Sequence, residues 1–156
     1  MDTRIKSCRD GKENKMKITL LPLTMELYDD VVALWKESPG VGVSGSDSRE
    51  GIQFFLERNP NLSFVTKDDK GNIAGAALCG HDGRRGYIYH IAVRPDCRRQ
   101  GIGRRLVERC LTRLRAVHIQ KCHICVLNDN SRGAEFWRGL GWTYRSDLSV
   151  ISKTIP

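Results

Sequence analysis

The chain has no apolar run of the roughly 18 residues that a membrane-spanning helix needs, so the sequence argues against a membrane partner. Residues 1–17 are charged and lack the apolar segment typical of a secretion signal. We therefore expect a cytoplasmic protein, in which the six cysteines are reduced thiols. Cys122 and Cys125 have a CxxC spacing, but no second ligand pair lies near them, so we expect buried thiols and no metal site.

Two common nucleotide-binding motifs are also missing. The chain has no Gly-Lys-Ser or Gly-Lys-Thr, which excludes a P-loop. The motif around Gly101 and Gly103 has neither the third glycine nor the downstream acidic residue of a dinucleotide-binding fingerprint. The net charge of +8 favours anionic partners. However, the basic residues follow one glycine loop and not an aromatic-studded surface, so nucleic acid is not an expected partner.

The pattern of apolar residues predicts a mixed α/β domain without internal repeats. Residues 1–16 are polar and aperiodic and are expected to be a flexible lead, which leaves 17–156 as a single domain. Asp47 or Ser48 is expected to cap the second helix, and Asn130 or Ser131 the last one. The predicted strands are 17–21, 62–66, 73–79, 87–93, 121–127 and 142–151, and the predicted helices, the first capped by Thr24, are 24–37, 48–58, 100–117 and 131–139.

The most informative stretch lies between the strand 87–93 and the helix that follows it. Pro95 stops further strand pairing because it has no N–H, and the chain then passes through residues 98–103 straight into the helix. The first N–H groups of a helix have no internal partner, and the helix dipole adds partial positive charge there. Gly101 and Gly103 would let a bulky ligand approach the backbone. These features together predict a phosphate or pyrophosphate site.

The same stretch, Arg98-Arg-Gln-Gly101-Ile-Gly103, resembles the Arg/Gln-x-x-Gly-x-Gly/Ala signature of the GCN5-related N-acetyltransferases, the GNAT family. The residues 91–95 before it resemble the family's usual strand end. Residues 130–142 resemble the second family signature, Asn-x-x-Ala-x-x-Phe-Tyr-x-x-x-Gly-Phe. The resemblance is close from Gly86 to Trp142, and the chain looks most like small bacterial members of the family.

The resemblance implies an N-acetyltransferase that moves an acetyl group from acetyl-CoA to a primary amine of a small molecule, peptide or protein by direct transfer. The alternative is a non-catalytic acetyl-CoA sensor. The implied α/β fold has a mixed, twisted sheet of about six or seven strands and about four helices, with a V-shaped splay between strands 87–93 and 121–127. Dimers are common among proteins of this resemblance, so a homodimer is one expected assembly. The residues implied in coenzyme binding are Ile91, Ala92, Val93, Arg98, Arg99, Gln100, Gly101, Ile102, Gly103, Arg104, Asn130, Phe136 and Trp137.

The residues that would carry the chemistry are less clear. The family commonly has Tyr where this chain has Trp137, and an indole donates a hydrogen bond but gives up no proton near neutral pH. Tyr144, Tyr89, Tyr87 or water remain as candidates for the group that protonates the leaving thiolate. The resemblance suggests the backbone N–H of Val93 as the donor that stabilises the oxyanion.

The base that deprotonates the amine is equally open. Strand alternation predicts Tyr87, Tyr89 and Ile91 on one face, and Ile88, His90 and Ala92 on the other. His90 would then serve as a base only if a β-bulge re-aims it, and a chain of water molecules is an alternative. Asp47 or Glu50 could bind a cationic acceptor, or both could be acids that complement a helix start.

Overall fold

The computed structural model describes residues 15–156, so residues 1–14 of the predicted flexible lead lie outside the described part of the chain. Met16, the last residue of that lead, packs against the core with its sulfur 3.8 Å from that of Cys97. The extent of the lead and of the single domain stays a prediction.

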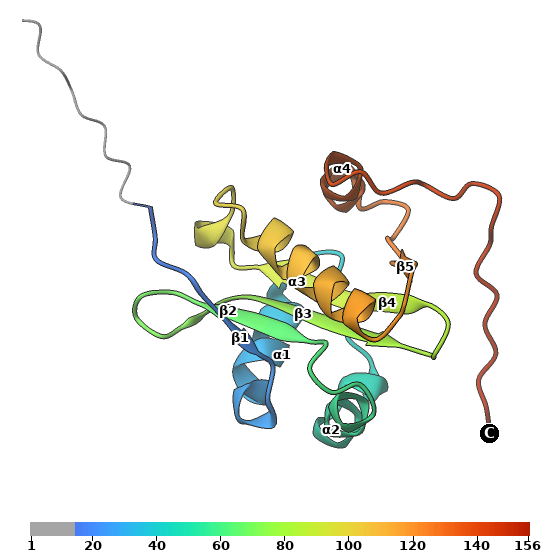
Figure 1. Cartoon of the computed structure of the whole chain (residues 1–156), viewed down its shortest axis with the longest axis horizontal. Helices are drawn as coiled ribbons and strands as arrows, with labels where there is room; N and C mark the ends of the chain where they lie inside the picture. The colour runs from blue at the N-terminus through green and yellow to red at the C-terminus, as the bar shows by residue number, and fades with distance from the viewer. Residues whose placement is uncertain (1–14) are drawn as a thin grey trace, which may run out of the picture.

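One five-stranded sheet runs through the described residues in the order β1-β2-β3-β4-β5 (Figure 1). The first three pairings are antiparallel, and β4 and β5 are parallel. Parallel pairing requires a crossover, which α3 supplies. The strands are β1 (Thr19–Pro22), β2 (Phe64–Lys67), β3 (Ile73–His81), β4 (Gly86–Val93) and β5 (Cys122–His123).

Four α-helices accompany the sheet. They are α1 (Tyr28–Glu37), α2 (Arg49–Arg58), α3 (Ile102–Ala116) and α4 (Ser131–Gly139), with 3-10 turns η1 (Met25–Leu27), η2 (Gly45–Asp47) and η3 (Pro95–Cys97). Ser48 caps α2 by accepting the Gly51 N–H, and Asn130 caps α4 by accepting the Gly133 N–H. Thr24 occupies the N-cap position of η1, which runs directly into α1, but its side chain makes no capping hydrogen bond. Across residues 15–156, every helix is too short or too polar to cross a bilayer.

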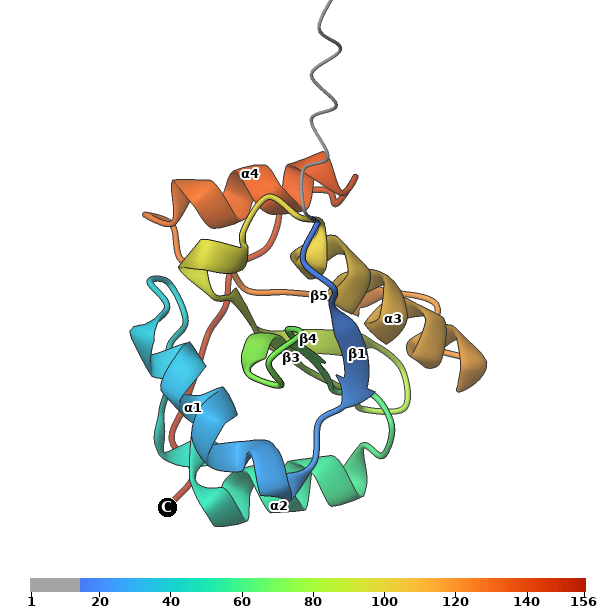
Figure 2. The same ribbon diagram turned by 90° about the vertical axis from the view of Figure 1, so that its left-hand side faces the viewer.

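The two faces of the sheet carry separate buried clusters. On one face α3 covers the sheet, and Leu106 and Leu114 pack there with Ile88 of β4. On the other face lie α1 and α2, whose Trp35 and Ile52 pack against the opposite side chains of the strands. Figures 1 and 2 show the sheet between α3 on one side and α1 with α2 on the other.

The sheet has fewer strands in the described residues than the six or seven expected. The strand predicted over 121–127 is reduced to Cys122–His123, because β5 pairs with β4 at only two positions before the two strands separate. The strand predicted over 142–151 is absent, and residues 143–156 are all exposed. Its apolar residues suit a strand, but strand preference depends on a neighbour to pair with, and this segment runs as extended chain down one side of the domain (Figure 1).

A β-bulge interrupts β4. His90 lies opposite Leu78 and Ile88 lies opposite Cys79, so Tyr89 has no partner on β3. The predicted alternation is therefore wrong: Ile88 packs on the α3 face, whereas the Tyr89 ring contacts Phe55 of α2 at 5.6 Å. The His90 ring contacts Trp35 of α1 at 4.9 Å, so Tyr89 and His90 share one face. A bulge re-aims side chains in this way.

Candidate active site

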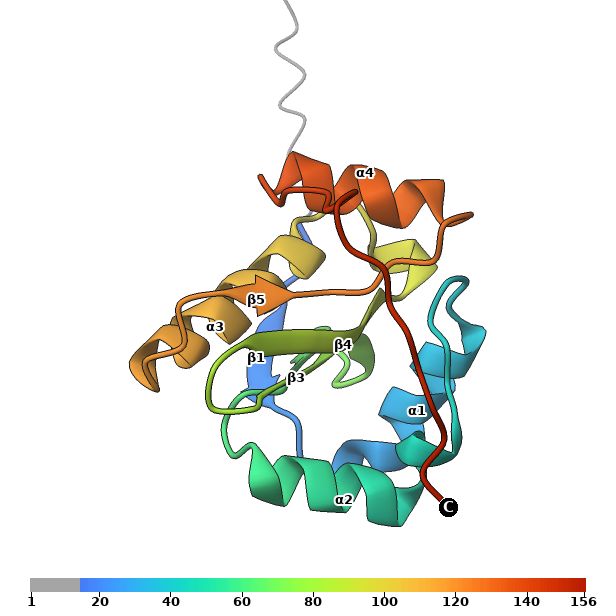
Figure 3. The same cartoon turned by 90° about the vertical axis from the view of Figure 1, so that its right-hand side faces the viewer.

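One edge of β4 is left open beyond Tyr87, where its pairing with β5 ends. The Arg94 N–H donates to the Ala74 carbonyl of β3 at 2.8 Å. Because backbone groups in an antiparallel pair alternate between the two edges, those of Ile91 and Val93 point away from β3, toward the side that β5 has left. Figure 3 views this edge, with β5 beside β4 and α4 above both strands. An extended ligand arm can add to such an edge as a strand does.

A cleft of about 960 Å³ opens at this edge. It runs between residues 89–93 of β4, residues 124–126 after β5, the loop into α3 and the inner face of α4. The cleft therefore gathers segments that lie far apart in the sequence. Of the residues predicted to bind the coenzyme, it is lined by Ile91, Ala92, Val93, Arg98, Arg99, Gly101, Ile102, Gly103, Arg104, Asn130, Phe136 and Trp137, and only Gln100 is not part of the lining.

The loop into α3 has the geometry of an anion cradle. Arg99 and Gly101 both have left-handed backbones, with φ of 62° and 78°. No side chain caps α3, and its first turn holds no acidic residue. A Cβ built on Gly101 would meet no atom within 4 Å, so the space over the loop is open. Uncapped N–H groups facing open space suit a phosphate group.

Two polar side chains of this loop differ in how their hydrogen-bonding groups are satisfied. Gln100 has a buried side-chain oxygen without a donor among residues 15–156, which is costly unless a ligand or water supplies one. The Arg98 side chain donates to the Val93 carbonyl at 3.3 Å, so it braces the loop against the end of β4. Arg98 therefore already has a partner within the protein, whereas the Gln100 oxygen has none among residues 15–156.

α4 forms the opposite wall of the cleft. A Cβ on Gly103 would lie 3.0 Å from the Phe136 ring, so only glycine lets this ring approach the start of α3 so closely. Trp137 is buried and packs edge-on against Trp142, with ring centroids 4.5 Å apart. The Asn130 amide lies where a side chain on Gly40 would be, so the loop after α1 touches the start of α4.

The three tyrosines predicted as catalytic candidates lie in different places. Tyr89 lines the cleft and is 53% exposed. Burial, and then the nearby Tyr87, raise the pKa of Tyr89 above its ordinary value. Tyr87 stacks on Tyr89 with centroids 5.8 Å apart but is not part of the cleft lining, and Tyr144 is 73% exposed and outside it. The structure thus brings only Tyr89 to the cleft.

A buried His–Asp pair lies beside Tyr89. The Nε2 atom of His90 is 2.8 Å from Oδ1 of Asp47, and the two side chains are 11% and 6% exposed. The sequence predicts each residue only by itself and does not predict the pair, because 43 residues separate them. The Ser44-x-x-Asp47 spacing of a capping box was the available signal, since the Ser44 N–H donates to Oδ2 of Asp47. Glu50, the other predicted acid, is exposed on α2.

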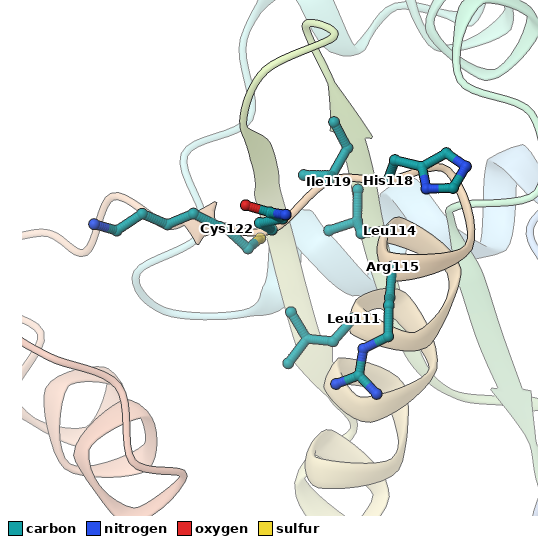
Figure 4. Close-up of a pocket in the computed structure, with 8 residues that line it drawn as sticks. Leu111, Leu114, Arg115, His118, Ile119 and Cys122 are labelled. Carbon is teal, nitrogen blue, oxygen red and sulfur yellow. The ribbon is translucent and has the colours of Figure 1, made fainter.

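A second pocket, of about 500 Å³, lies at the C-terminal end of α3 (Figure 4). Leu111, Leu114 and His118 line it, and it contains none of the predicted site residues. In the part of the chain that the structure describes, no three His, Cys, Asp or Glu side chains are grouped to hold a metal ion. Cys122 is half-buried and Cys125 exposed, so the expectation of two buried thiols is wrong for Cys125.

Comparison with known proteins settles the family. Residues 28–142 match the model of the Acetyltransferase (GNAT) family. The chain belongs to the GNAT family. An acetyltransferase of Yersinia pestis (strain Pestoides F) is 31% identical over 128 residues, which cover 82% of this chain and 89% of that protein.

Solved structures of low sequence identity share the GNAT fold. The aminoglycoside antibiotic 6'-N-acetyltransferase AAC(6')-IG from Acinetobacter haemolyticus has a TM-score of 0.72 at 16% identity, covering 88% of this chain and 99% of its own. A chain of the NatC complex bound to Gag peptide and CoA has a TM-score of 0.68 at 24% identity, covering 80% and 84%. This GNAT protein is an N-acetyltransferase that acts on an amine with acetyl-CoA as co-substrate, and the alternative of a non-catalytic sensor is not favoured.

Proposed function

We propose that this GNAT protein holds acetyl-CoA in the cleft between β4 and α4 and transfers the acetyl group directly to a primary amine of a small molecule, peptide or protein. The observation that carries the proposal is the cleft itself, which unites the open edge of β4 with the uncapped start of α3. An extended arm ending in a diphosphate needs both features next to each other.

Each part of the cleft has a role in this proposal. The N–H groups of residues 99–104 hold the pyrophosphate, with Arg99 and Arg104 adding positive charge. The backbone groups of Ile91 and the carbonyl of Val93 pair with the amide-bearing arm, which leaves the Val93 N–H for the oxyanion. Asn130 contributes only its side-chain NH₂ group, since its oxygen already caps α4. Phe136 and Trp137 close the wall beside the thioester.

The reaction needs a neutral amine, a stabilised oxyanion and a leaving thiolate. The Val93 N–H is our candidate for the oxyanion donor, because it points toward the open edge of β4. Of the three predicted tyrosines only Tyr89 lines the cleft, so it is our candidate for the acid that protonates the thiolate. Direct transfer gains its rate mainly from holding both reactants in place. The absence of a metal requirement, the cytoplasmic location and the homodimer remain predictions.

The acceptor enters from the side of the loop after α1. Among the structural relatives, one is named for an aminoglycoside and another was solved with a peptide. Aminoglycosides and peptides both carry primary amines, so a panel of both classes is the first search. Release of free thiol from acetyl-CoA above the hydrolysis background, together with an acetylated product by mass spectrometry, would support the proposed activity.

The coenzyme site is tested by Gly101→Glu. A carboxylate within about 4 Å of a phosphate is repelled by several kcal/mol at an effective dielectric constant near 20, so acetyl-CoA binding should weaken at least about a hundredfold. Gly83→Glu is the matched control, because Gly83 also has a positive φ, of 89°, and open space around it, but lies in the β3–β4 turn. Equal coenzyme affinity of the two variants in calorimetry would refute the assignment of the cradle.

A further inference from the structure

His90 lines the cleft, and its ring is paired behind the cleft wall with Asp47, whose side chain is 6% exposed and is not part of the lining. His90 lies opposite Leu78 on the α1 face and lines the cleft, and the bulge at Tyr89 brings the Tyr89 ring to the same face. The Trp35 ring packs against the His90 ring at an angle of 56°, with ring centroids 4.9 Å apart, and restricts its orientation. A buried, oriented imidazole at the wall of a reaction cleft is a typical proton acceptor.

The contacts of Asp47 determine which nitrogen of His90 carries the proton. One carboxylate oxygen accepts the Ser44 N–H at 2.8 Å, and the other lies 2.8 Å from Nε2 of His90. An ionised carboxylate only accepts hydrogen bonds, so Nε2 must donate, and the neutral ring then carries a lone pair on Nδ1. Among residues 15–156 the ring makes no hydrogen bond other than the one through Nε2, so that lone pair is free to accept.

We propose that His90 accepts the proton of the acceptor ammonium through Nδ1, and that Asp47 is the positioning residue that keeps the ring in this tautomer. The inference rests on the proposed function and adds the base that the sequence could not assign. Tyr89, the candidate acid beside it, is not suited to be the base, because burial raises its pKa.

The protons and electrons balance with groups already present. An N–H bond of the ammonium breaks, its electron pair stays on nitrogen, and the proton moves to Nδ1. The nitrogen then bonds to the thioester carbonyl carbon, and the C–S bond breaks with its electron pair leaving on sulfur. The nitrogen loses a second proton as the adduct collapses. One of the two protons ends on the thiol and the other in solvent.

The titratable and charged groups around the ring come from several elements. Asp47 belongs to η2, Tyr28 of α1 donates its hydroxyl to the Asp47 carbonyl, and Tyr89 is the neighbour on β4. Cys125, Glu135 and the arginines of the loop into α3 share the cleft. A pH effect assigned to His90 must therefore disappear in the His90 variant and persist in variants elsewhere.

The kinetic test uses the full chain, acetyl-CoA and phenethylamine as the acceptor probe. At pH 7, His90→Gln should lower kcat/KM for the amine by about 10²–10³, the usual range for a lost general base, with KM for acetyl-CoA within about twofold. The rate of His90→Gln should then rise with pH in step with the free amine, whose ammonium has a pKa near ~10.4. Asp47→Asn should show a smaller loss, and His118→Gln, at the exposed end of α3, none.

A purely structural role predicts a different pattern, in which His90→Gln loses activity equally at every pH or loses coenzyme affinity. Either result would overturn the proposal. NMR of the His90 ring nitrogens in the unaltered protein decides independently of turnover: the neutral ring should carry its proton on Nε2, and a proton on Nδ1 would also overturn it. If no amine of any class releases thiol, the transferase proposal itself fails. The NMR result still tests the tautomer of His90, because it does not depend on turnover.

Discussion

Trp137 replaces a tyrosine that is common at the matching position of the resembling family, and its surroundings identify it as a packing residue. Its ring is buried and lies edge-on to Trp142 and to Phe136, at 4.5 and 5.1 Å. Trp137→Phe should lower the free energy of unfolding by about 1–2 kcal/mol through lost aromatic contact. The pH profile of kcat should not change, because an indole does not titrate near neutrality.

Denaturant unfolding and rates from pH 6 to 10 check this prediction, with Trp137→Tyr as the matched variant. The phenol has an ordinary pKa near ~10, so a new alkaline limb should appear in the Tyr variant alone. A shifted alkaline limb in Trp137→Phe would contradict the packing role.

For single residues, the sequence predicts a role best where that role depends on the residue's own chemistry and not on its contacts in the fold. Gly101, Gly103 and Arg98 were predicted from the backbone freedom of glycine and the free N–H groups at a helix start; the structure places all three in the lining of the cleft, and their role in binding coenzyme stays a prediction. The partnership of Asp47 with His90 was not found, because it depends on a bulge and on a loop folding back across the sheet. Tyr144 was a poor candidate for the same reason, since its position depends on a strand that is absent.

Among the elements, the end of β4 is tied to the β2–β3 turn by Arg94. Its guanidinium donates to Asp68 at 2.9 Å and to the Ile73 carbonyl at 3.0 Å. The hydrogen bond from Arg94, followed by that from the Asn72 N–H, holds the pKa of Asp68 below its usual range. Because the lowered pKa belongs to the folded state, Asp68 stabilises the fold above its unfolded pKa of ~3.9.

That stabilisation should disappear as the pH falls from about 4 through the lowered pKa of Asp68 in the folded state. Asp68→Asn should therefore be less stable than the unaltered protein at pH 7 and approach it at pH 2–3. Denaturant unfolding at several pH values measures the gap. Asp96→Asn is the control, since Asp96 also binds Arg94 but is exposed, and it should show a smaller gap. A gap for Asp68→Asn that stays constant with pH would contradict the ion pair's role.

The helices and the first four strands were predicted well because each has a clear local period and, for α2 and α4, a capping residue. The last two strands were not, since β5 and the segment 142–151 have strand-like composition but only β4 to pair with. Composition measures the preference of a segment, whereas pairing needs a partner elsewhere in the molecule.

For the whole molecule, the segment after Trp142 contributes no buried residue to the domain. Residues 143–156 are all exposed, and the match to the GNAT family ends at residue 142. Removing residues 143–156 should therefore change the free energy of unfolding by less than about 1 kcal/mol and leave acetyl-CoA affinity unchanged. Denaturant unfolding and calorimetry on the truncated chain give both quantities.

This segment also exposes apolar side chains. Leu148, Val150 and Ile151 lie on extended chain and are 58%, 77% and 93% exposed. Exposed apolar side chains on extended chain are a surface on which another protein chain can pack. Light scattering on the full and truncated chains measures the number of chains per particle, and this number shows whether a second copy covers the segment. The same number of chains per particle in both proteins would agree with a segment that packs on no second copy. Fewer chains per particle for the truncated protein, together with a loss of several kcal/mol in stability, would contradict the truncation prediction and show that the segment packs on a second copy.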